Sequence, residues 1–519
     1  FMFKTKNHIE LQKNIGFIFF TLALLLALLI RTYFMHGQYI DGVLYSTIAR
    51  DMYNGTGSIW EPIWYTGQNY AEANSITIMS IPGKTAVGYP FYEHPSFSIF
   101  LNSLFYRVFG DSIFIDKLYI FSTFILSVFF VCLIWRRCFK HLSWHYLWIP
   151  ILFWLFVPEL LWIYKSNMFQ NTEAVFSLCA SWLIFVSLDI KLNYKKDKKL
   201  FFDSCVFTSL AAIALFFAFL TNGFESLFPL GIYMAHWLVI RSESFSRACF
   251  RSFLLLSVFL LFGLMFFYLI PAAYHNFYMY FKIQVLSSFI GNRGGVEFGW
   301  YRFYILYGVF QKLIPLIILS ILFYYFYYKN KLVCKNSFFK SFAQYINDDK
   351  RIMLFMLIGL MGSAPIVLSS RQNLWYVAQS FSYFLLGFLF ILTPIIETFL
   401  GSNKFKKINS SRFKIFMFIL LLISASFVFL NSGKPYRDKK IFTDVVMISK
   451  VVPSGMVVGF KGEGGTTELI TYLQRYNQTY LSSKGKRQYY ISEKGSKALV
   501  GYNKLDLNTN LYNLHKLKE

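Results

Sequence analysis

IGFIFFTLALLLALLIRTYFM, residues 15–35, is followed directly by HGQYIDGVLYSTIARDMYNG, residues 36–55. The first stretch is apolar and long enough to cross a bilayer as a helix, which takes roughly 20 residues. The second stretch repeats apolar residues at helical spacing, and it carries Asp41 a few residues beyond the expected lipid boundary. The pattern predicts a membrane span followed at once by an amphipathic helix.

The composition of the whole chain also indicates a membrane protein. Of the 519 residues, 56% are hydrophobic, 21% are aromatic and only 15% are charged, so most of the chain is unsuited to a soluble surface. The net charge of +25 comes from short basic clusters between apolar runs rather than from one basic face. This distribution argues against a nucleic-acid-binding protein.

Apolar runs of near-spanning length predict about eleven transmembrane helices. They cover residues 15–35, 113–134, 143–163, 171–190, 201–220, 224–240, 250–271, 302–328, 352–370, 375–398 and 413–431. The basic clusters fall in alternate links, which the positive-inside rule places in the cytoplasm. The opposite side then carries the long loop 36–112, a loop near 272–301 and the C-terminal tail. We expect the function on that outer side.

The predicted fold class is an all-α polytopic membrane protein with a small C-terminal α/β soluble domain. Residues 1–431 are expected to form the transmembrane domain, including the outer loop 36–112, and residues 432–519 the soluble domain. The tail pattern predicts a helix, a strand, a second helix and then several short strands; the first three cover 438–452, 456–460 and 466–476.

The first helix of the outer loop is predicted to lie on the membrane surface. Tyr45 belongs to its apolar stripe, Arg50 and Asp51 lie off that stripe, and Gly55 ends the helix. Asp41 stands at its N-terminal end, where a carboxylate can cap free backbone amides. The spacing alone favours this capping role for Asp41.

A second surface helix is predicted after YEHPSF, residues 92–97. Pro95 suits a first helical turn, an apolar stripe follows, and Gly110 closes the helix. Glu93 and His94 stand at its head, and Glu93 can equally be a cap. The loop therefore presents two helices, each with ionisable side chains at its N-terminal end.

These motifs resemble, in order, those of the membrane-embedded glycosyltransferases of the C superfamily, especially the branch of the lipid A aminoarabinose transferases and protein O-mannosyltransferases. DGVLYSTIARDMYNG (41–55) is similar to the family's acidic motif followed by Tyr-Ala-x-x-Ala-Arg-x-Met and glycine. YEHPSF is similar to its aromatic-Glu-Lys-Pro-Pro motif. Three later stretches also match in family order: TNGFESLFPL (221–230), YHNFYMYFKIQVLSSFIGNRGG (274–295) and SSRQNLWYVAQSFSYFLLG (369–387).

The chain departs from the family pattern at several positions. The acidic pair of the family is Asp41-Gly42 here, and the lysine of its second motif is His94. The lysine of its Thr-Lys-Gly stretch is Asn222. Where the family often has an aspartate at the start of the fourth span, this chain has QNTEAVF (170–176). Only Asp41 remains to carry the acidic role of the first motif.

The resemblance implies an inverting transfer of a sugar from a polyprenyl-phosphate donor to a lipid, glycan or protein acceptor. The expected setting is a bacterial cytoplasmic membrane, with the site and the C-terminal domain facing the periplasm or exterior. Asp41 is the expected general base, because the attacking hydroxyl loses its proton as the glycosidic bond forms. Side chains expected to bind the donor phosphate or sugar are His94, Glu93, Arg371, Lys84, Arg293 and Tyr45.

Alternatives apply to several of these residues. Tyr45 is also suited to interface packing, and Arg371 to anchoring a span among lipid headgroups. Glu93 and His94 are too sparse for a zinc site, so no metal site is predicted, although a divalent metal ion stays open as a cofactor.

A transporter or flippase is the alternative function, but transporters usually carry ionisable residues near the midplane of their spans. Here the acidic residues crowd the outer loop instead.

Overall fold

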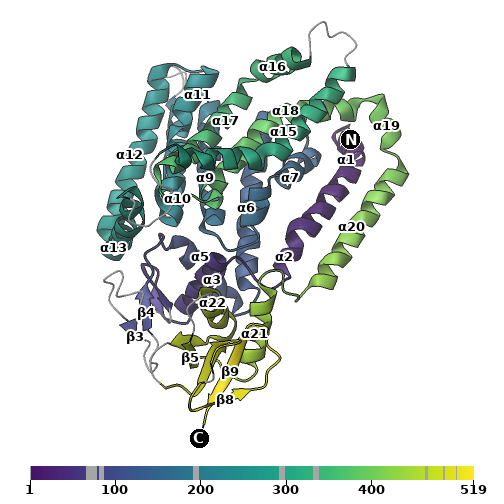
Figure 1. Cartoon of the computed structure of the whole chain (residues 1–519). Helices are drawn as coiled ribbons and strands as arrows, with labels where there is room; N and C mark the ends of the chain where they lie inside the picture. The colour runs from purple at the N-terminus through teal and green to yellow at the C-terminus, as the bar shows by residue number, and fades with distance from the viewer. Residues whose placement is uncertain are drawn as a thin grey trace.

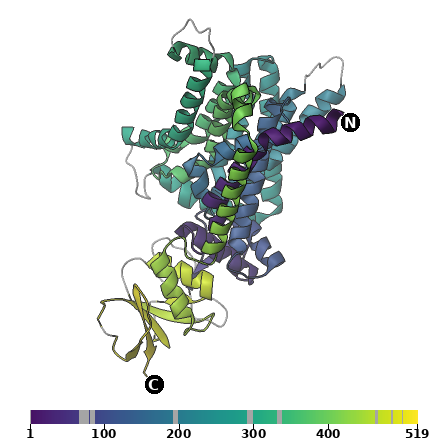
Figure 2. The same cartoon turned by 90° about the vertical axis from the view of Figure 1, so that its right-hand side faces the viewer.

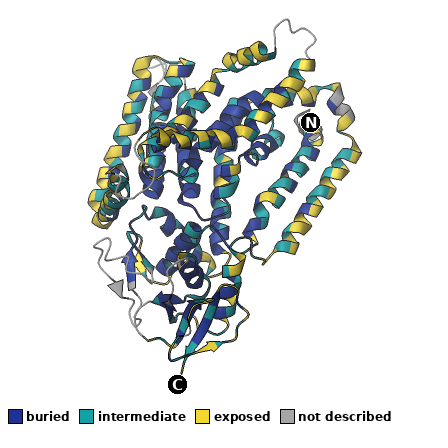
Figure 3. Cartoon of the chain, in the orientation of Figure 1, coloured by how far each residue is buried: buried dark blue, intermediate teal, exposed yellow. Residues whose placement is uncertain are grey.

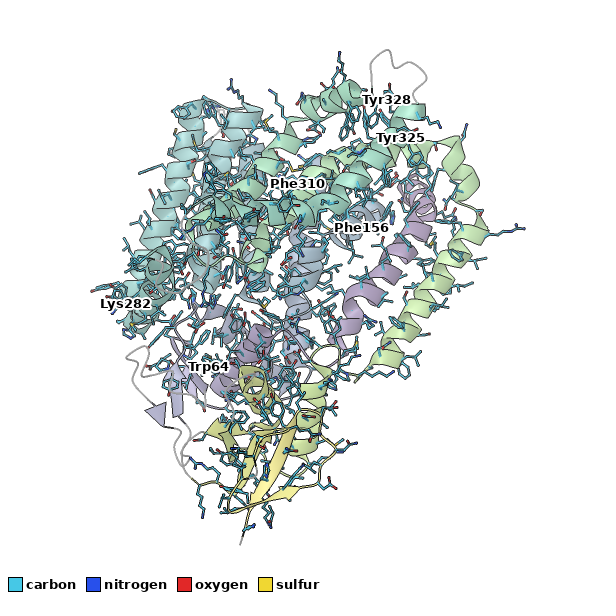
Figure 4. All side chains as sticks on the ribbon, viewed as in Figure 1. Trp64, Phe156, Lys282, Phe310, Tyr325 and Tyr328 are labelled. Atoms are coloured by element: carbon cyan, nitrogen blue, oxygen red, sulfur yellow. The ribbon has the colours of Figure 1, made fainter. Side chains whose placement is uncertain are left out.

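The computed structural model describes residues 2–65, 79–80, 87–190, 198–290, 299–330, 338–461, 466–482, 486–497 and 499–518. A helical bundle forms most of the molecule, and a small domain with a β-sheet projects from one end of it (Figure 1, Figure 2). We call this end the domain side. Trp64 lies toward the domain side, whereas Tyr325 and Tyr328 lie at the opposite end (Figure 4).

The described residues contain nine helical segments that are long and apolar enough to cross a membrane. Large apolar side chains remain exposed on the outer faces of the bundle, as expected where a surface meets lipid (Figure 3). The predicted polytopic α-helical architecture is confirmed. The nine segments are Glu10–Tyr33, Ile115–Cys138, Phe169–Asp189, Lys199–Ile240, Phe245–Leu269, Trp300–Lys329, Lys350–Leu368, Leu374–Gly401 and Ser411–Asn431.

The first loop separates α2 from α6 in the series of helical elements that form the bundle. In chain order they are α1 (Met2–Leu25), η1 (Leu26–Ile30), α2 (Arg31–Tyr33), α6 (Ile115–Cys138), η2 (Trp144–Tyr146), α7 (Trp148–Trp154), α8 (Pro158–Ile163), α9 (Phe169–Asp189), α10 (Lys198–Asn222), η3 (Gly223–Gly231), α11 (Ile232–Ile240), α12 (Phe245–Leu269), α13 (Pro271–Tyr280), η4 (Phe281–Leu286), α14 (Ser287–Ile290), η5 (Trp300–Phe303), α15 (Tyr304–Asn330), α16 (Phe338–Asp348), α17 (Lys350–Ser363), η6 (Ala364–Leu368), η7 (Leu374–Ser380), α18 (Phe381–Gly401), α19 (Asn403–Ile408) and α20 (Ser411–Asn431).

Two of the expected spans are not single long α-helices. The span predicted over 143–163 consists of η2 and the short helices α7 and α8, and the last of these begins at Pro158, whose ring cannot continue a preceding helix. The span predicted over 224–240 consists of η3 and α11, which fold back along α10. The hydrogen bond of 2.8 Å between Tyr233 Oη and Thr208 Oγ1 shows this return.

The basic links gather at the end opposite the domain side. Arg137, in the last turn of α6, and Lys140, just after it, both pair with Asp189 at the end of α9, at 2.9 and 3.1 Å. Arg351, at the start of α17, donates to the carbonyl oxygen of Cys138. Links that the positive-inside pattern assigned to one side of the membrane therefore meet at one end of the bundle.

The first loop forms a compact layer between the bundle and the C-terminal domain. Helices α3 (Ile40–Tyr53) and α5 (Phe97–Phe109) flank a four-stranded antiparallel sheet with the order β1-β2-β4-β3. On α5 the buried face carries Ser98 and Asn102, while Val108 is exposed, as a helix facing lipid should be. The strands are β1 (Gly57–Ser58), β2 (Glu61–Tyr65), β3 (Met79–Ser80) and β4 (Val87–Pro90).

Helix α3 is buried and does not lie on the membrane surface, so this part of the prediction is wrong. All residues from Gly42 to Met52 are buried, and Arg50 and Asp51 are only 1% and 2% exposed. Helix α22 (Thr466–Asn477) of the C-terminal domain packs against the face that we expected to meet solvent (Figure 1). The covering helix is distant in sequence, so local spacing could not reveal it.

The C-terminal domain follows the predicted order of helix, strand, helix and short strands. Its five-stranded sheet has the order β6-β5-β7-β9-β8, with β5 parallel to β6 and β7 and the remaining pairs antiparallel. Val43 of α3 joins the hydrophobic core of this domain. The elements besides α22 are α21 (Lys439–Ser449), β5 (Val457–Lys461), β6 (Tyr480–Ser482), β7 (Tyr489–Glu493), β8 (Tyr502–Leu505) and β9 (Tyr512–Leu517).

Candidate functional site

A cavity of about 350 Å³ lies where the first loop meets several irregular helical segments of the bundle. Contributing segments are the end of α10 and the short helices η3, η4, η6 and η7. Irregular backbone at membrane depth is tolerated where it lines a cavity, because its polar groups then avoid lipid. The polar side chains that line this cavity are His94, Asn222, Glu225, Tyr280, Gln284, Ser288, Ser369, Arg371 and Tyr376.

Two of the predicted donor-binding side chains, His94 and Arg371, meet in this cavity. His94 lies between β4 and α5, and its ring centroid is 4.7 Å from that of Phe169 on α9. The loop that carries Arg371 is held by Ser369, whose hydroxyl donates to Arg371 O (2.9 Å) and accepts from Arg371 N (3.2 Å). The fold thus places two basic side chains from distant segments around one volume.

Asp41 and Glu93 lie next to each other beside this volume. Asp41 is the second residue of α3, near the positive end of the helix dipole. Burial, together with the neighbouring Glu93 carboxylate, nevertheless raises the pKa of Asp41 to about 6. The structure therefore produces a carboxyl group that changes charge close to neutral pH.

Tyr45 connects Asp41 to the cavity. It is buried one turn after Asp41, and its ring centroid lies 4.0 Å from that of Phe169 and 6.0 Å from that of His94. Burial raises the pKa of Tyr45, and the charges of Asp41, Tyr376 and Glu93 raise it further. Tyr45 is thus a packed side chain between Asp41 and the cavity wall, which agrees with its packing alternative.

Neither Asp41 nor Glu93 occupies the N-cap position of its helix. The N-cap residue of α3 is Tyr39, which makes no side-chain cap bond, and its backbone N–H donates to Ser166 Oγ (2.9 Å). The N-cap residue of α5 is Ser96. The capping alternative for Asp41 is therefore wrong, because α3 already begins at Ile40.

The structure also explains why glycine follows Asp41. A Cβ atom added to Gly42 would lie 2.8 Å from the backbone nitrogen of Asn167 and 3.3 Å from Ser166 Cβ. Helix α3 packs directly against that backbone. A backbone atom cannot shift to make room for a Cβ, whereas the end of a flexible side chain can. A second carboxylate at position 42 has no room here, so Asp41 is the acid that this motif retains.

We expect Gly42→Ala to destabilise the protein by about 1–3 kcal/mol, the usual cost of overpacking a tight contact. Gly401→Ala is the matched control: a Cβ there meets no atom within 4 Å, and alanine is the better helix former. Thermal unfolding in detergent should show a lower Tm for Gly42→Ala and an equal or higher Tm for Gly401→Ala. Equal unfolding temperatures for both variants would contradict the tight packing at Gly42.

Asn222, at the cavity wall, joins the buried Glu173 to the half-buried Glu225, which also lines the cavity. Its Nδ2 donates to Glu173 Oε2 at 2.7 Å and to Glu225 Oε2 at 3.0 Å. Sequence comparison with the family singled out Asn222 and the segment that contains Glu173, but not Glu225, Tyr280 or Tyr376. The sequence signal for this part of the cavity wall is Gly223. Its φ is +75°, which favours glycine, and a Cβ there would collide with the Tyr280 ring.

Lys84 and Arg293 lie outside the described residues. Among the residues that the structure describes, no group of three or more His, Cys, Asp or Glu side chains has the arrangement of a metal site. Asp41 and Glu93 supply only two carboxylates, and a divalent-ion cage needs more oxygen ligands than these.

The chain is similar in fold to ArnT from Cupriavidus metallidurans. The structure of that protein bound to undecaprenyl phosphate matches with a TM-score of 0.58 at 12% identity, covering 96% of this chain and 97% of that chain. Its apo structure matches with a TM-score of 0.53 at 12% identity, covering 98% of each chain. No protein-family model and no curated protein matches the sequence. The likeness confirms the predicted fold, a polytopic helical membrane protein with a small C-terminal domain.

Proposed function

We propose that this protein transfers a sugar from a polyprenyl-phosphate donor to a lipid, glycan or protein acceptor by an inverting displacement. The main support is the cavity that holds His94 and Arg371 and lies beside the Asp41–Glu93 pair. The fold adds weight, since it is similar to that of ArnT, which is bound to undecaprenyl phosphate in the matching structure.

An apolar hollow next to the cavity suits the tail of such a donor. Its volume is about 670 Å³, and it shares Leu227, Phe228, Met361, Pro365 and Leu368 with the cavity. Leu368 is 57% exposed, so this wall reaches the surface of the bundle that faces lipid. A ligand with a phosphate head and a long apolar tail would occupy both volumes, with its tail entering from the membrane.

Asp41 has the features of a general base for the acceptor. The attacking hydroxyl must lose its proton as its oxygen bonds to the anomeric carbon, and a carboxylate with a pKa near the working pH serves that purpose. In a single displacement the sugar never bonds to the protein, so one carboxylate is enough. Glu93 contributes by raising the pKa of Asp41.

Arg371 and His94 are suited to the leaving group. As the bond to the sugar breaks, the departing phosphate gains negative charge. A guanidinium and an imidazole N–H beside it stabilise the transition state more than the ground state, which raises the rate of the chemical step. Both side chains line the cavity.

We place the domain side of the bundle at the periplasmic or exterior face of a bacterial cytoplasmic membrane. The clustering of Arg137, Lys140 and Arg351 at the opposite end supports this orientation. The sugar of a lipid-linked donor would then reach Asp41 at the outer boundary of the bilayer.

The pH dependence of transfer follows from the raised pKa of Asp41. Only the carboxylate form accepts a proton, so we expect kcat to be low under acidic conditions, to rise through a pH of about 6 and to level off above it. Initial rates of label transfer between about pH 5 and pH 8 would show this limb. A rate that falls as pH rises across the same interval would contradict the role of Asp41 as base.

The proposed reaction can be tested by incubating purified protein in lipid nanodiscs with a radiolabelled polyprenyl-phosphate sugar and acceptor membranes. Label should move to the acceptor and leave unlabelled lipid phosphate behind. A transporter would instead move the labelled lipid across a sealed vesicle without breaking its sugar–phosphate bond. Translocation without transfer would therefore overturn the proposal in favour of the transporter alternative.

A further inference from the structure

We propose that helix α22 of the C-terminal domain holds α3, and with it Asp41, in the position needed for catalysis. Gln38 and Arg475 are the positioning residues in this arrangement. The inference rests on the proposed function of Asp41, but the packing that carries it is visible in the structure independently of that function.

One face of α3 belongs to the C-terminal domain. Val43 is fully buried in the core of that domain, and Arg50, seven residues later on the same face, is buried beneath α22. Arg50 Nη1 donates to the carbonyl oxygens of Gln474 and Arg475, the latter at 2.8 Å, and Arg50 Nη2 pairs with Asp51 at 2.7 Å. The last carbonyls of a helix lack partners within the helix, so a buried cation stabilises this end of α22.

A second buried connection runs from α22 to the residues just before Asp41. Arg475 Nη2 donates to Asp116 Oδ1 (3.0 Å) and to Ser112 O (2.8 Å), and Asp116 also accepts a hydrogen bond from Gln38 Nε2. Gln38 Oε1 accepts from Asn167 N at 2.8 Å. Gln38, Asp116 and Arg475 are each at most 3% exposed.

Gln38 is the point at which this network reaches the site. Its backbone carbonyl accepts from Tyr472 Oη of α22 (3.2 Å), and its side chain is bonded at both ends. Asp41 follows three residues later, in the first turn of α3. Buried hydrogen bonds restrict the motion of the segments they join, so α22, α6 and the segment before α9 together hold the start of α3.

The position of Asp41 matters because proton transfer requires a short distance to the attacking hydroxyl. A displacement of about 1 Å costs up to about 100-fold in rate. Weakening the network should therefore lower kcat, whereas binding of the donor in the cavity should change little, because His94 and Arg371 do not belong to the network. A purely structural contact would lower stability without this selective loss of kcat.

The test compares Arg475→Met and Gln38→Met with Arg251→Met. Arg251 is a matched control, since it is 3% exposed, pairs with Glu243 at 3.0 Å and donates to Ile190 O at the end opposite the domain side. Amide hydrogen exchange of residues 40–53 reports how firmly α3 is held. Steady-state transfer gives kcat and the KM for the donor, normalised to the fraction of protein that binds undecaprenyl phosphate.

In Arg475→Met and Gln38→Met we expect faster exchange over 40–53, a fall in kcat of about tenfold or more, and an unchanged KM. Arg251→Met should lower Tm and leave both readouts at wild-type values. Unchanged exchange in α3, or unchanged kcat despite faster exchange, would overturn the inference. Gln38→Met carries the test if Arg475→Met does not fold. If the proposed function itself is wrong, the wild type will transfer no sugar. Hydrogen exchange over residues 40–53 will still show whether α22 holds α3, so the two failures can be told apart.

Discussion

Asp41→Asn should lower sugar transfer by about 10²- to 10⁴-fold, the usual contribution of a general base. Asparagine has nearly the same shape but cannot accept the proton of the attacking hydroxyl. No neighbour in the motif can replace Asp41, because position 42 has room only for glycine. Label transfer from a radiolabelled polyprenyl-phosphate sugar measures the loss, and the remaining activity should no longer rise with pH through about 6.

The stability of Asp41→Asn should show that the loss is catalytic. Because the pKa of Asp41 is raised in the folded protein, ionisation of Asp41 destabilises the fold as pH rises from about 4 through about 6. Asparagine removes that cost, so we expect a Tm at pH 7 equal to or above that of the wild type. Glu61→Gln, on β2 of the same loop, is the matched control and should retain activity. Full transfer by Asp41→Asn would refute the assignment of the base.

Arg371→Met should lower kcat/KM for the donor by about 10²- to 10³-fold, as loss of a group that stabilises developing negative charge usually does. Arg371 lines the cavity that we assign to the donor phosphate. Arg371→Lys keeps the charge but loses the planar fork that binds two phosphate oxygens, so it should recover part of the activity. The measurements are steady-state transfer and the Kd for undecaprenyl phosphate.

Arg107→Met provides the control for Arg371. Arg107 is an exposed cation on α5 of the first loop, and it does not line the cavity. Its loss changes the net charge equally but should leave kcat/KM near the wild-type value. Equal losses in both variants would mean that the charge acts by general attraction of anionic lipid. Arg371 would then be an anchor among headgroups, the alternative that its sequence position also allows.

The long spans and the sidedness of the basic links were predictable from sequence because both depend on local composition. Roughly 20 apolar residues suffice for a span, whatever they pack against. The order of elements in the C-terminal domain was predictable for the same reason. The division of the 143–163 and 224–240 spans into short helices was not predictable from sequence. Short 3₁₀ and α segments are stable only through contacts with neighbouring segments of the fold.

The candidate site was predictable in part. The resemblance to a family pointed to Asp41, Glu93, His94 and Arg371, and the structure gathers these four around one region. It did not identify Glu225, although the turn at Gly223 lies within one of the stretches that carry the resemblance. A side chain becomes a cavity wall through its direction and its neighbours, and a short motif defines neither.

By itself, the sequence determined that Asp41 would stand just beyond the first span, at the start of a helix, because apolar run length and helical spacing are local properties. Only the tertiary structure decided that this helix is buried, that Arg50 lies beneath α22 and donates to Arg475 O, and that burial beside Glu93 raises the pKa of Asp41. These properties depend on segments up to 425 residues apart. Their meeting is set by packing of the whole chain, which no local pattern encodes.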